Sequence, residues 1–205
     1  MTTRLNFFRI VWTGLFAIST LLGAPGALSE DKGNPIVLMK TTEGDITIEL
    51  FADKSPITVK NFLRYVDNGH YDGTVFHRVI PNFMIQGGGF TEALEEKPTK
   101  DPIVNESKNR LHNIRGTLAM ARTNDPDSAT AQFFINQRTT LRLDWSPGKD
   151  GYAVFGEVLD GMQVVDIIAL SDTGQAPAMT TRGPTILQNA PVKPIIILSV
   201  QRMAR

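Results

Sequence analysis

The run from Val75 to Gly88, VFHRVIPNFMIQGG, carries the residues most suited to chemistry. Alternation along a strand that starts at Phe76 places Phe76, Arg78 and Ile80 on one face, so a guanidinium group is expected among large apolar side chains. Burying such a charge without a partner is costly. Arg78 is therefore either paired with a carboxylate in a structural role or is a functional group, and the pattern does not decide between the two.

Other kinds of site find little support in the residue types. His77 is expected on the opposite face from Arg78, as a hydrogen-bonded structural residue rather than a general base. The chain has three histidines at spacings unlike those of a metal site, and it has no cysteine. Gly87-Gly88-Gly89 lacks the Gly-Lys-Ser/Thr that completes a phosphate loop, and is better explained as a bend or bulge in a curved sheet. We therefore predict no metal and no cofactor.

Two regular elements precede this run. Residues 36–39 are apolar, residues 45–50 alternate between apolar and polar, and Glu43-Gly44-Asp45 between them is typical of a turn, which predicts a β-hairpin. Ser55-Pro56 is typical of a helix start. Apolar residues then recur at i, i+3, i+4 and i+7 until Asn68-Gly69, so the spacing predicts one amphipathic helix.

Short strands separated by loops dominate the rest of the chain. We predict them at residues 75–80, 83–86, 117–121, 133–136, 153–158 and 195–200. The longest loops, 87–116 and 122–131, are of a length that is usually functional in a compact domain. A second, nearly all-apolar helix at 162–170 should cover a core rather than face water. The pattern indicates a mainly β domain with a closed or nearly closed antiparallel sheet and helices capping its ends.

The first 29 residues differ from the remainder. Arg4 and Arg9 precede an uncharged apolar run from Ile10 to Leu22, and Ala27-Leu28-Ser29 offers small residues at a cleavage site, which is the layout of a signal peptide. An uncleaved membrane anchor is the alternative, but Gly23, Pro25 and Gly26 interrupt the run before it is long enough to span. We therefore expect export, a mature domain at residues 30–205 and no stable membrane association after cleavage.

The charge balance of the chain limits the classes of partner that it is expected to bind. The whole chain has 21 basic and 21 acidic residues, and no cluster of Lys and Arg resembles a phosphate-binding stripe. Nucleic acid is therefore not an expected partner. The length of 205 residues fits one globular domain, and we expect it to be a monomer.

Five motifs resemble the successive signatures of the cyclophilins, a family of peptidyl-prolyl cis/trans isomerases. They appear in the family's order and spacing: FHRVI at 76–80, FMIQGG at 83–88, LAMA at 118–121, QFFIN at 132–136 and VFG at 154–156. The set is most similar to the bacterial periplasmic branch, which carries AMART as at 119–123 and GYAVFG as at 151–156. The resemblance covers residues 34 to 201 apart from the loops. It implies an eight-stranded antiparallel β-barrel closed by two α-helices, and a periplasmic location.

The resemblance also implies a groove on the outer face of the barrel. The matching positions are Arg78, Phe83, Met84, Gln86, Ala121, Phe134 and Leu143, with Tyr152 where many members carry a histidine. Arg142 stands where many members carry a tryptophan, which predicts weak binding of cyclosporin, the cyclic-peptide inhibitor typical of the family. Tyr152 keeps an aromatic wall and a hydrogen-bonding tip.

These matches predict an enzyme that accelerates rotation about X-Pro bonds in exported polypeptides and so assists their folding. Arg78 would stabilise the twisted amide, Gln86 would steady the substrate backbone, and the other six residues would bind the substrate. One alternative is a non-catalytic chaperone that grips proline-containing segments, but binding alone does not require Arg78. A barrel with a vestigial groove is another alternative, and a hydrolase is weaker because no Ser-His-acid motif is present.

Overall fold

The computed structural model describes residues 1–2 and 33–204, and the fold is formed by residues 33–204. The predicted signal peptide at residues 1–29 lies almost entirely outside the described residues, so its cleavage and the boundary at residue 30 stay predictions. Among the described residues, no helix is long and apolar enough to cross a membrane.

Eight antiparallel strands close into a barrel in the order β1-β10-β3-β4-β6-β5-β7-β2. Their bounds are β1 Ile36–Thr41, β2 Gly44–Leu50, β3 Thr74–Ile80, β4 Met84–Thr91, β5 Thr117–Met120, β6 Phe133–Asn136, β7 Val154–Asp160 and β10 Ile196–Arg202. The closed barrel that the resemblance implied is therefore confirmed. Closure leaves no exposed sheet edge and encloses a core filled by side chains.

Helix α1, Pro56–Asp67, begins and ends as predicted, with Ser55 as N-cap and Asn68 as C-cap. Val59, Phe62 and Val66 are buried and belong to the same core cluster as the barrel interior. The Ser55 hydroxyl accepts no capping bond from the helix N–H groups, and instead donates to the carbonyl oxygen of Val154, 2.7 Å away. This bond ties the start of α1 to strand β7.

Helix α2, Met162–Ala169, covers the core with only one of its faces. Val164, Val165 and Ile168 are buried in the barrel core. In contrast, Ile167 is 51% exposed and Leu170, at the C-cap, is 77% exposed. The expectation that this apolar segment avoids water was therefore only partly correct, because a helix packed on the end of a barrel buries one stripe of residues.

The glycine run lies inside β4, where the pairing with β3 shifts register twice, between Thr74 and Phe76 and between Phe76 and Arg78. Gly88 has φ +83°, and a Cβ there would lie 2.8 Å from the ring of Tyr71. The predicted bulge is thus present, and the predicted loop from residue 87 instead begins after Thr91. Because the bulge interrupts alternation, Phe76 joins the interior core while Arg78 lies on the outer face. The prediction that these two residues share a face was wrong.

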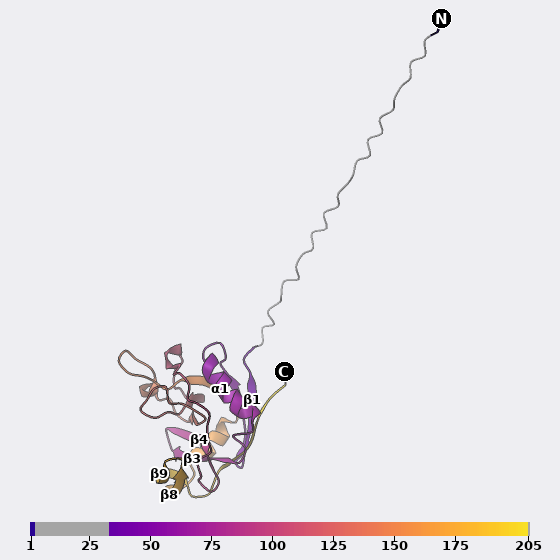
Figure 1. The fold of residues 1–205 in the computed structure, drawn as a ribbon. Helices are drawn as coiled ribbons and strands as arrows, with labels where there is room; N and C mark the ends of the chain where they lie inside the picture. Colours follow the sequence, from indigo (N-terminus) through magenta and orange to yellow (C-terminus); the bar gives the residue numbers. More distant parts are fainter. Residues whose placement is uncertain (3–32, 205) are drawn as a thin grey trace. The chain divides into compact units, whose positions relative to one another are not determined.

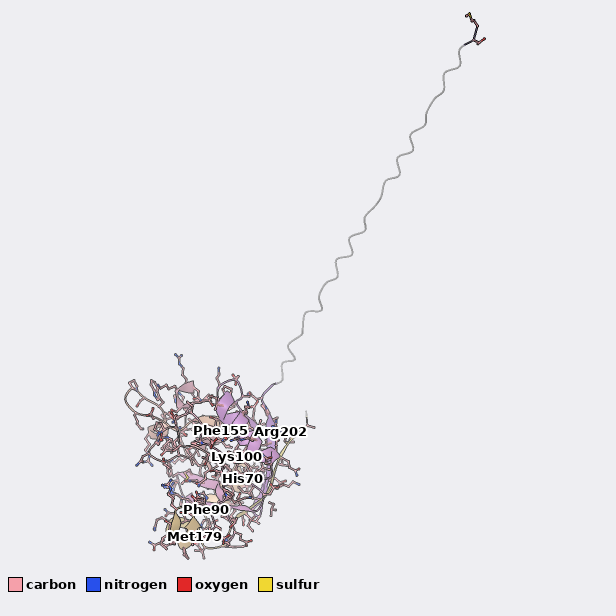
Figure 2. All side chains as sticks on the ribbon, viewed as in Figure 1. His70, Phe90, Lys100, Phe155, Met179 and Arg202 are labelled. Carbon is pink, nitrogen blue, oxygen red and sulfur yellow. The ribbon has the colours of Figure 1, made fainter. Side chains whose placement is uncertain are left out.

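A second sheet of two strands, β8 Thr173–Thr180 and β9 Gly183–Pro191, lies outside the barrel. The sequence patterns assigned no element to residues 171–190, so this hairpin was missed. Strand β9 lies against β3 (Figure 1). Ala178 packs with Val75 and Phe90 in a small separate cluster, and Phe90 lies beside the hairpin strand that carries Met179 (Figure 2).

Candidate functional site

The floor of the candidate site is formed by side chains that point outward from four neighbouring strands. Met84 of β4, Ala119 of β5, Phe134 of β6 and Val154 of β7 make one buried cluster, distinct from the barrel interior. The alternate residues on these strands, such as Ile85 and Phe133, fill the interior instead. Period-two alternation therefore builds an apolar floor on the outside of a barrel whose inside is already filled.

A cavity of about 200 Å³ opens above this floor. It is lined by Arg78, Phe83, Met84, Gln86, Ala121, Arg122, Phe134, Leu143 and Tyr152. All eight residues that were expected to form a groove thus meet around one cavity, although their individual roles stay predictions. Arg122 is the one lining residue to which sequence reasoning gave no role.

Arg78 enters the cavity from β3 with its charge unpaired. Its Nη1 donates a long hydrogen bond of 3.4 Å to Oε1 of Gln86, and Nε2 of Gln86 donates to Oε1 of Gln132 at 3.0 Å. Within residues 33–204, no carboxylate forms an ion pair with Arg78. This excludes the carboxylate-paired structural alternative. Burial lowers the pKa of Arg78, yet a guanidinium stays charged in proteins, so several N–H donors remain for a ligand.

One wall of the cavity is held by a polar network beneath the short 3-10 helix η2, Leu141–Leu143. Asp144 accepts hydrogen bonds from the backbone N–H of Asn113 at 2.7 Å and from its Nδ2 at 2.9 Å, and it pairs with Nδ1 of His112 at 2.8 Å. Burial favours a higher pKa for Asp144, but the hydrogen bonds from Asn113 and His112 have the larger combined effect, so the pKa of this carboxyl is lowered overall. The carboxylate anchors Leu143, whose carbonyl oxygen accepts from the N–H of Tyr152 at 2.9 Å.

Arg122 joins two loops beside the cavity and contacts Tyr152, the residue bonded to Leu143. Its guanidinium lies 4.6 Å from the ring centroid of Tyr152, which in turn packs edge-on against Phe134 at 5.6 Å. The same group donates to the backbone carbonyls of Thr123, Asp150 and Gly151. These partners lie up to 29 residues away in the sequence, so local sequence gave no signal of this role beyond the AMART motif itself.

The histidines take no part in the cavity. His77 is buried, packs against Phe90 with ring centroids 4.7 Å apart, and its Nδ1 has no hydrogen-bond partner. Burial lowers its pKa to about 4, so the ring is neutral near pH 7. Among the residues that the structure describes, no group of three His, Cys, Asp or Glu side chains is placed to hold a metal ion.

A larger hollow of about 870 Å³ runs along α1, but its chemistry is less suited to a reaction. Asp67 and Arg202, at its edge, pair with each other at 2.6 Å, and Nη2 of Arg64 donates to Oδ1 of Asn61 at 2.9 Å. An apolar floor that meets an unpaired guanidinium occurs in the smaller cavity, which is therefore the candidate site.

Most of this chain, including the candidate site, is similar to known peptidyl-prolyl cis-trans isomerases. The family model described as "Cyclophilin type peptidyl-prolyl cis-trans isomerase/CLD" matches residues 36–202. A peptidyl-prolyl cis-trans isomerase of Acinetobacter baylyi is 52% identical over 184 residues, covering 90% of this chain and 94% of that protein. Peptidyl-prolyl cis-trans isomerase B of Escherichia coli K12 is 51% identical over 169 residues, covering 80% of this chain and 98% of that protein.

Solved structures agree with the sequence relatives. The crystal structure of a cyclophilin type peptidyl-prolyl cis-trans isomerase of Cryptosporidium parvum has a TM-score of 0.67 and 25% identity, and the match covers 84% of this chain and 99% of that one. A second structure of it, in the presence of the dipeptide Ala-Pro, has a TM-score of 0.66. The family inferred from the five motifs is thereby confirmed. The chain belongs to the cyclophilin family and is a peptidyl-prolyl cis-trans isomerase.

Proposed function

We propose that this isomerase acts on proline-containing segments of exported polypeptides and assists their folding in the periplasm. The support for export is the positive start, apolar run and small-residue cleavage site within residues 1–29. We further propose that the mature domain works as a monomer without stable membrane association. Weak cyclosporin binding belongs to the same proposal, because Arg142 contacts the ring of Phe83 instead of providing an aromatic surface of its own.

The chemistry requires no bond to form or break between heavy atoms. Rotation about an X-Pro bond has a barrier of about 20 kcal/mol because the C–N resonance must be lost. A catalyst therefore needs to bind the twisted amide more tightly than either planar form. The apolar part of the cavity, made by Phe83, Met84, Phe134 and Leu143, suits a proline ring. The crystal structure of the Cryptosporidium relative in the presence of the dipeptide Ala-Pro supports a ligand of this class.

Arg78 is the single observation that carries the catalytic role. As resonance is lost, the prolyl nitrogen becomes pyramidal and gains a lone pair that can accept a hydrogen bond. The Arg78 guanidinium has no carboxylate partner and stands half-buried at the edge of the cavity, where a donated hydrogen bond is stronger than in water. Gln86, which contacts Arg78 and is itself held by Gln132, would orient Arg78 and steady the substrate backbone.

The test is the cis-to-trans conversion of a short X-Pro peptide by residues 30–205, with Arg78→Ala compared with the parent. We expect kcat/KM to fall about a hundredfold, the usual effect of removing one preorganised donor, while the fold survives. Arg182→Ala is the matched control, since Arg182 is exposed in the turn between β8 and β9. Equal rates for Arg78→Ala and the parent would show that the assigned role is wrong.

Two outcomes separate this proposal from its alternatives. A folded parent that binds proline peptides without accelerating their isomerisation would favour the non-catalytic chaperone. Export is tested separately by expressing the full chain in a Gram-negative bacterium and determining the N-terminus of the purified protein. A product that begins at Glu30 in the periplasmic fraction is expected, while a chain lacking residues 1–29 should stay in the cytoplasm. Retention of Met1 on the exported product would contradict signal cleavage.

A further inference from the structure

Three guanidinium groups surround the candidate site, and its lining contains no carboxylate. Arg78 and Arg122 line the cavity directly. Arg142 adds a third group, because its Cζ lies 5.0 Å from the ring centroid of Phe83, another lining residue. The chain as a whole has equal numbers of basic and acidic residues, so this local excess of positive charge is not a property of the average surface.

None of the three charges is neutralised within residues 33–204. The ion pairs of that region join Lys54 to Asp53, Arg115 to Asp166 and Arg202 to Asp67, and Nδ1 of His112 lies 2.8 Å from the Asp144 carboxylate. Arg122 donates only to backbone carbonyls, which fix its position and leave its charge uncompensated.

Three acidic side chains on the adjoining loops are held by hydrogen bonds, while Asp150 contacts Arg122 through its backbone carbonyl. Asp144 accepts hydrogen bonds from Asn113 and His112. Asp127 accepts from the backbone N–H of Asn105 at 2.8 Å, and Asp125 accepts from the backbone N–H of Asp127 at 3.0 Å. These bonds fix the positions of the three carboxylates, and no acidic side chain of residues 33–204 forms an ion pair with Arg78, Arg122 or Arg142.

We propose that this site selects acidic substrates: X-Pro segments that carry Asp or Glu two or three residues from the proline. The inference rests on the proposed function and deepens it. Arg122 and Arg142 are the specificity-determining residues, because each presents a positive charge beside the apolar pocket that would hold the proline ring, while Arg78 faces the rotating bond.

The positions follow from the contacts between the rings. The ring centroids of Phe134, on the cavity floor, and Tyr152 lie 5.6 Å apart. On Tyr152, the Cζ atom of Arg122 lies 4.6 Å from the ring centroid. An extended peptide advances about 3.3–3.6 Å per residue. The two contacts together therefore span at most about three residues of an extended substrate. A carboxylate at that distance from the proline can meet Arg122, whereas a lysine there is repelled.

The experiment compares peptides that are identical except for Glu, Gln or Lys two or three residues from the proline, on either side of it. Both kcat/KM and peptide affinity are measured at low ionic strength. One exposed charge pair changes affinity by about two- to fivefold. With attraction of Glu and repulsion of Lys combined, we expect the parent to prefer Glu over Lys by about tenfold, with Gln in between. Added salt should reduce this ratio because it screens the charges.

The variants assign the preference to individual residues. Arg122→Gln and Arg142→Gln should each lower the Glu-to-Lys ratio by about two- to fivefold, whatever they do to the rate with the Gln peptide. Arg182→Gln removes an exposed charge from the β8–β9 turn and should leave the ratio unchanged. A lower rate with all three peptides at a constant ratio would mean that Arg122 is only structural, and would overturn its assignment.

Failure of this inference differs from failure of the proposed function. Equal turnover of the three peptides, or a preference for Lys, would overturn acidic selection and leave isomerisation intact. No turnover of any peptide would refute the proposed function. In that case, the affinities still decide the inference, since tighter binding of the Glu peptide supports it and equal binding contradicts it.

Discussion

Acidification from pH 7 to pH 4 should destabilise the folded protein through the imidazole of His77. The side chain is 3% exposed, lies against Phe90 and has no hydrogen-bond partner at Nδ1. Burial lowers its pKa to about 4, whereas a histidine in an unfolded chain titrates near 6.5. The folded protein therefore keeps this ring neutral over a pH range in which the unfolded chain takes up a proton.

The sign and size follow from this difference in pKa. Between about pH 6.5 and pH 4 the unfolded state binds more protons, so the free energy of unfolding falls as the pH falls. The stability that the neutral ring contributes is complete above pH 6.5 and lost by about pH 4. One pKa unit corresponds to about 1.4 kcal/mol, so the full loss is about 3 kcal/mol. This is a large part of the roughly 5–15 kcal/mol that stabilises a typical domain.

The measurement is urea unfolding of the parent and His77→Leu at pH 7.0, 5.5 and 4.5. Between pH 7.0 and 4.5 we expect the variant to lose about 2.5 kcal/mol less than the parent, because leucine cannot be protonated. His70→Gln is the comparison, since burial and Lys97 lower the pKa of His70, which is less buried than His77, and its effect should be smaller. The same pH dependence in His77→Leu and the parent would refute the reasoning.

Three further predictions concern single positions. Phe134→Ala should raise KM and cost about 3 kcal/mol of stability, since the ring is 4% exposed on the cavity floor; saturation kinetics and urea unfolding measure both effects. Asp144→Asn should lower kcat/KM several-fold, because Asn113 and His112 are then held less firmly. It should also remove the part of the acid sensitivity that arises below about pH 4, since the folded state lowers the pKa of Asp144. Rate measurements and urea unfolding across pH test the two effects. Gly88→Ala should give little folded protein, because its positive φ and the approach to Tyr71 exclude a Cβ; thermal unfolding checks it.

Much of the fold could be predicted because its signals are local. Ser55-Pro56 and Asn68 mark the ends of α1, and the alternation at 45–50 marks β2, as the structure shows. The β8–β9 hairpin could not be predicted in this way. Strand β8 reads TGQAPAMT, with few β-branched residues and a proline, so its propensity for a strand is weak. It is held by pairing with β9 and by the packing of Ala178 against β3 and β4.

In contrast to α1 and β2, the candidate site depends mainly on contacts between residues that are distant in the sequence. Residue patterns identified Arg78 as unusual but placed it on the same face as Phe76. That placement was wrong because the bulge between Phe76 and Arg78 in the β3–β4 pairing interrupts the alternation of side chains. The remaining positions came from the family resemblance, and the structure brings them to one cavity. Arg122 needed the structure itself, since its partners at Asp150 and Gly151 are remote in sequence.

The site combines a rigid floor with walls that are held by polar contacts. All four residues of β6, Phe133–Asn136, are buried, so the loops must cover the outer face of this strand as the barrel core covers its inner face. Substitutions in the floor should therefore lower stability and activity together, since the same side chains complete the packing. The walls depend instead on Asp144 and Arg122, whose bonds join exposed loops. Changes there should alter rate and substrate preference at a smaller cost in stability. A correlated loss of both properties in wall variants would show that the walls, too, belong to the folding core.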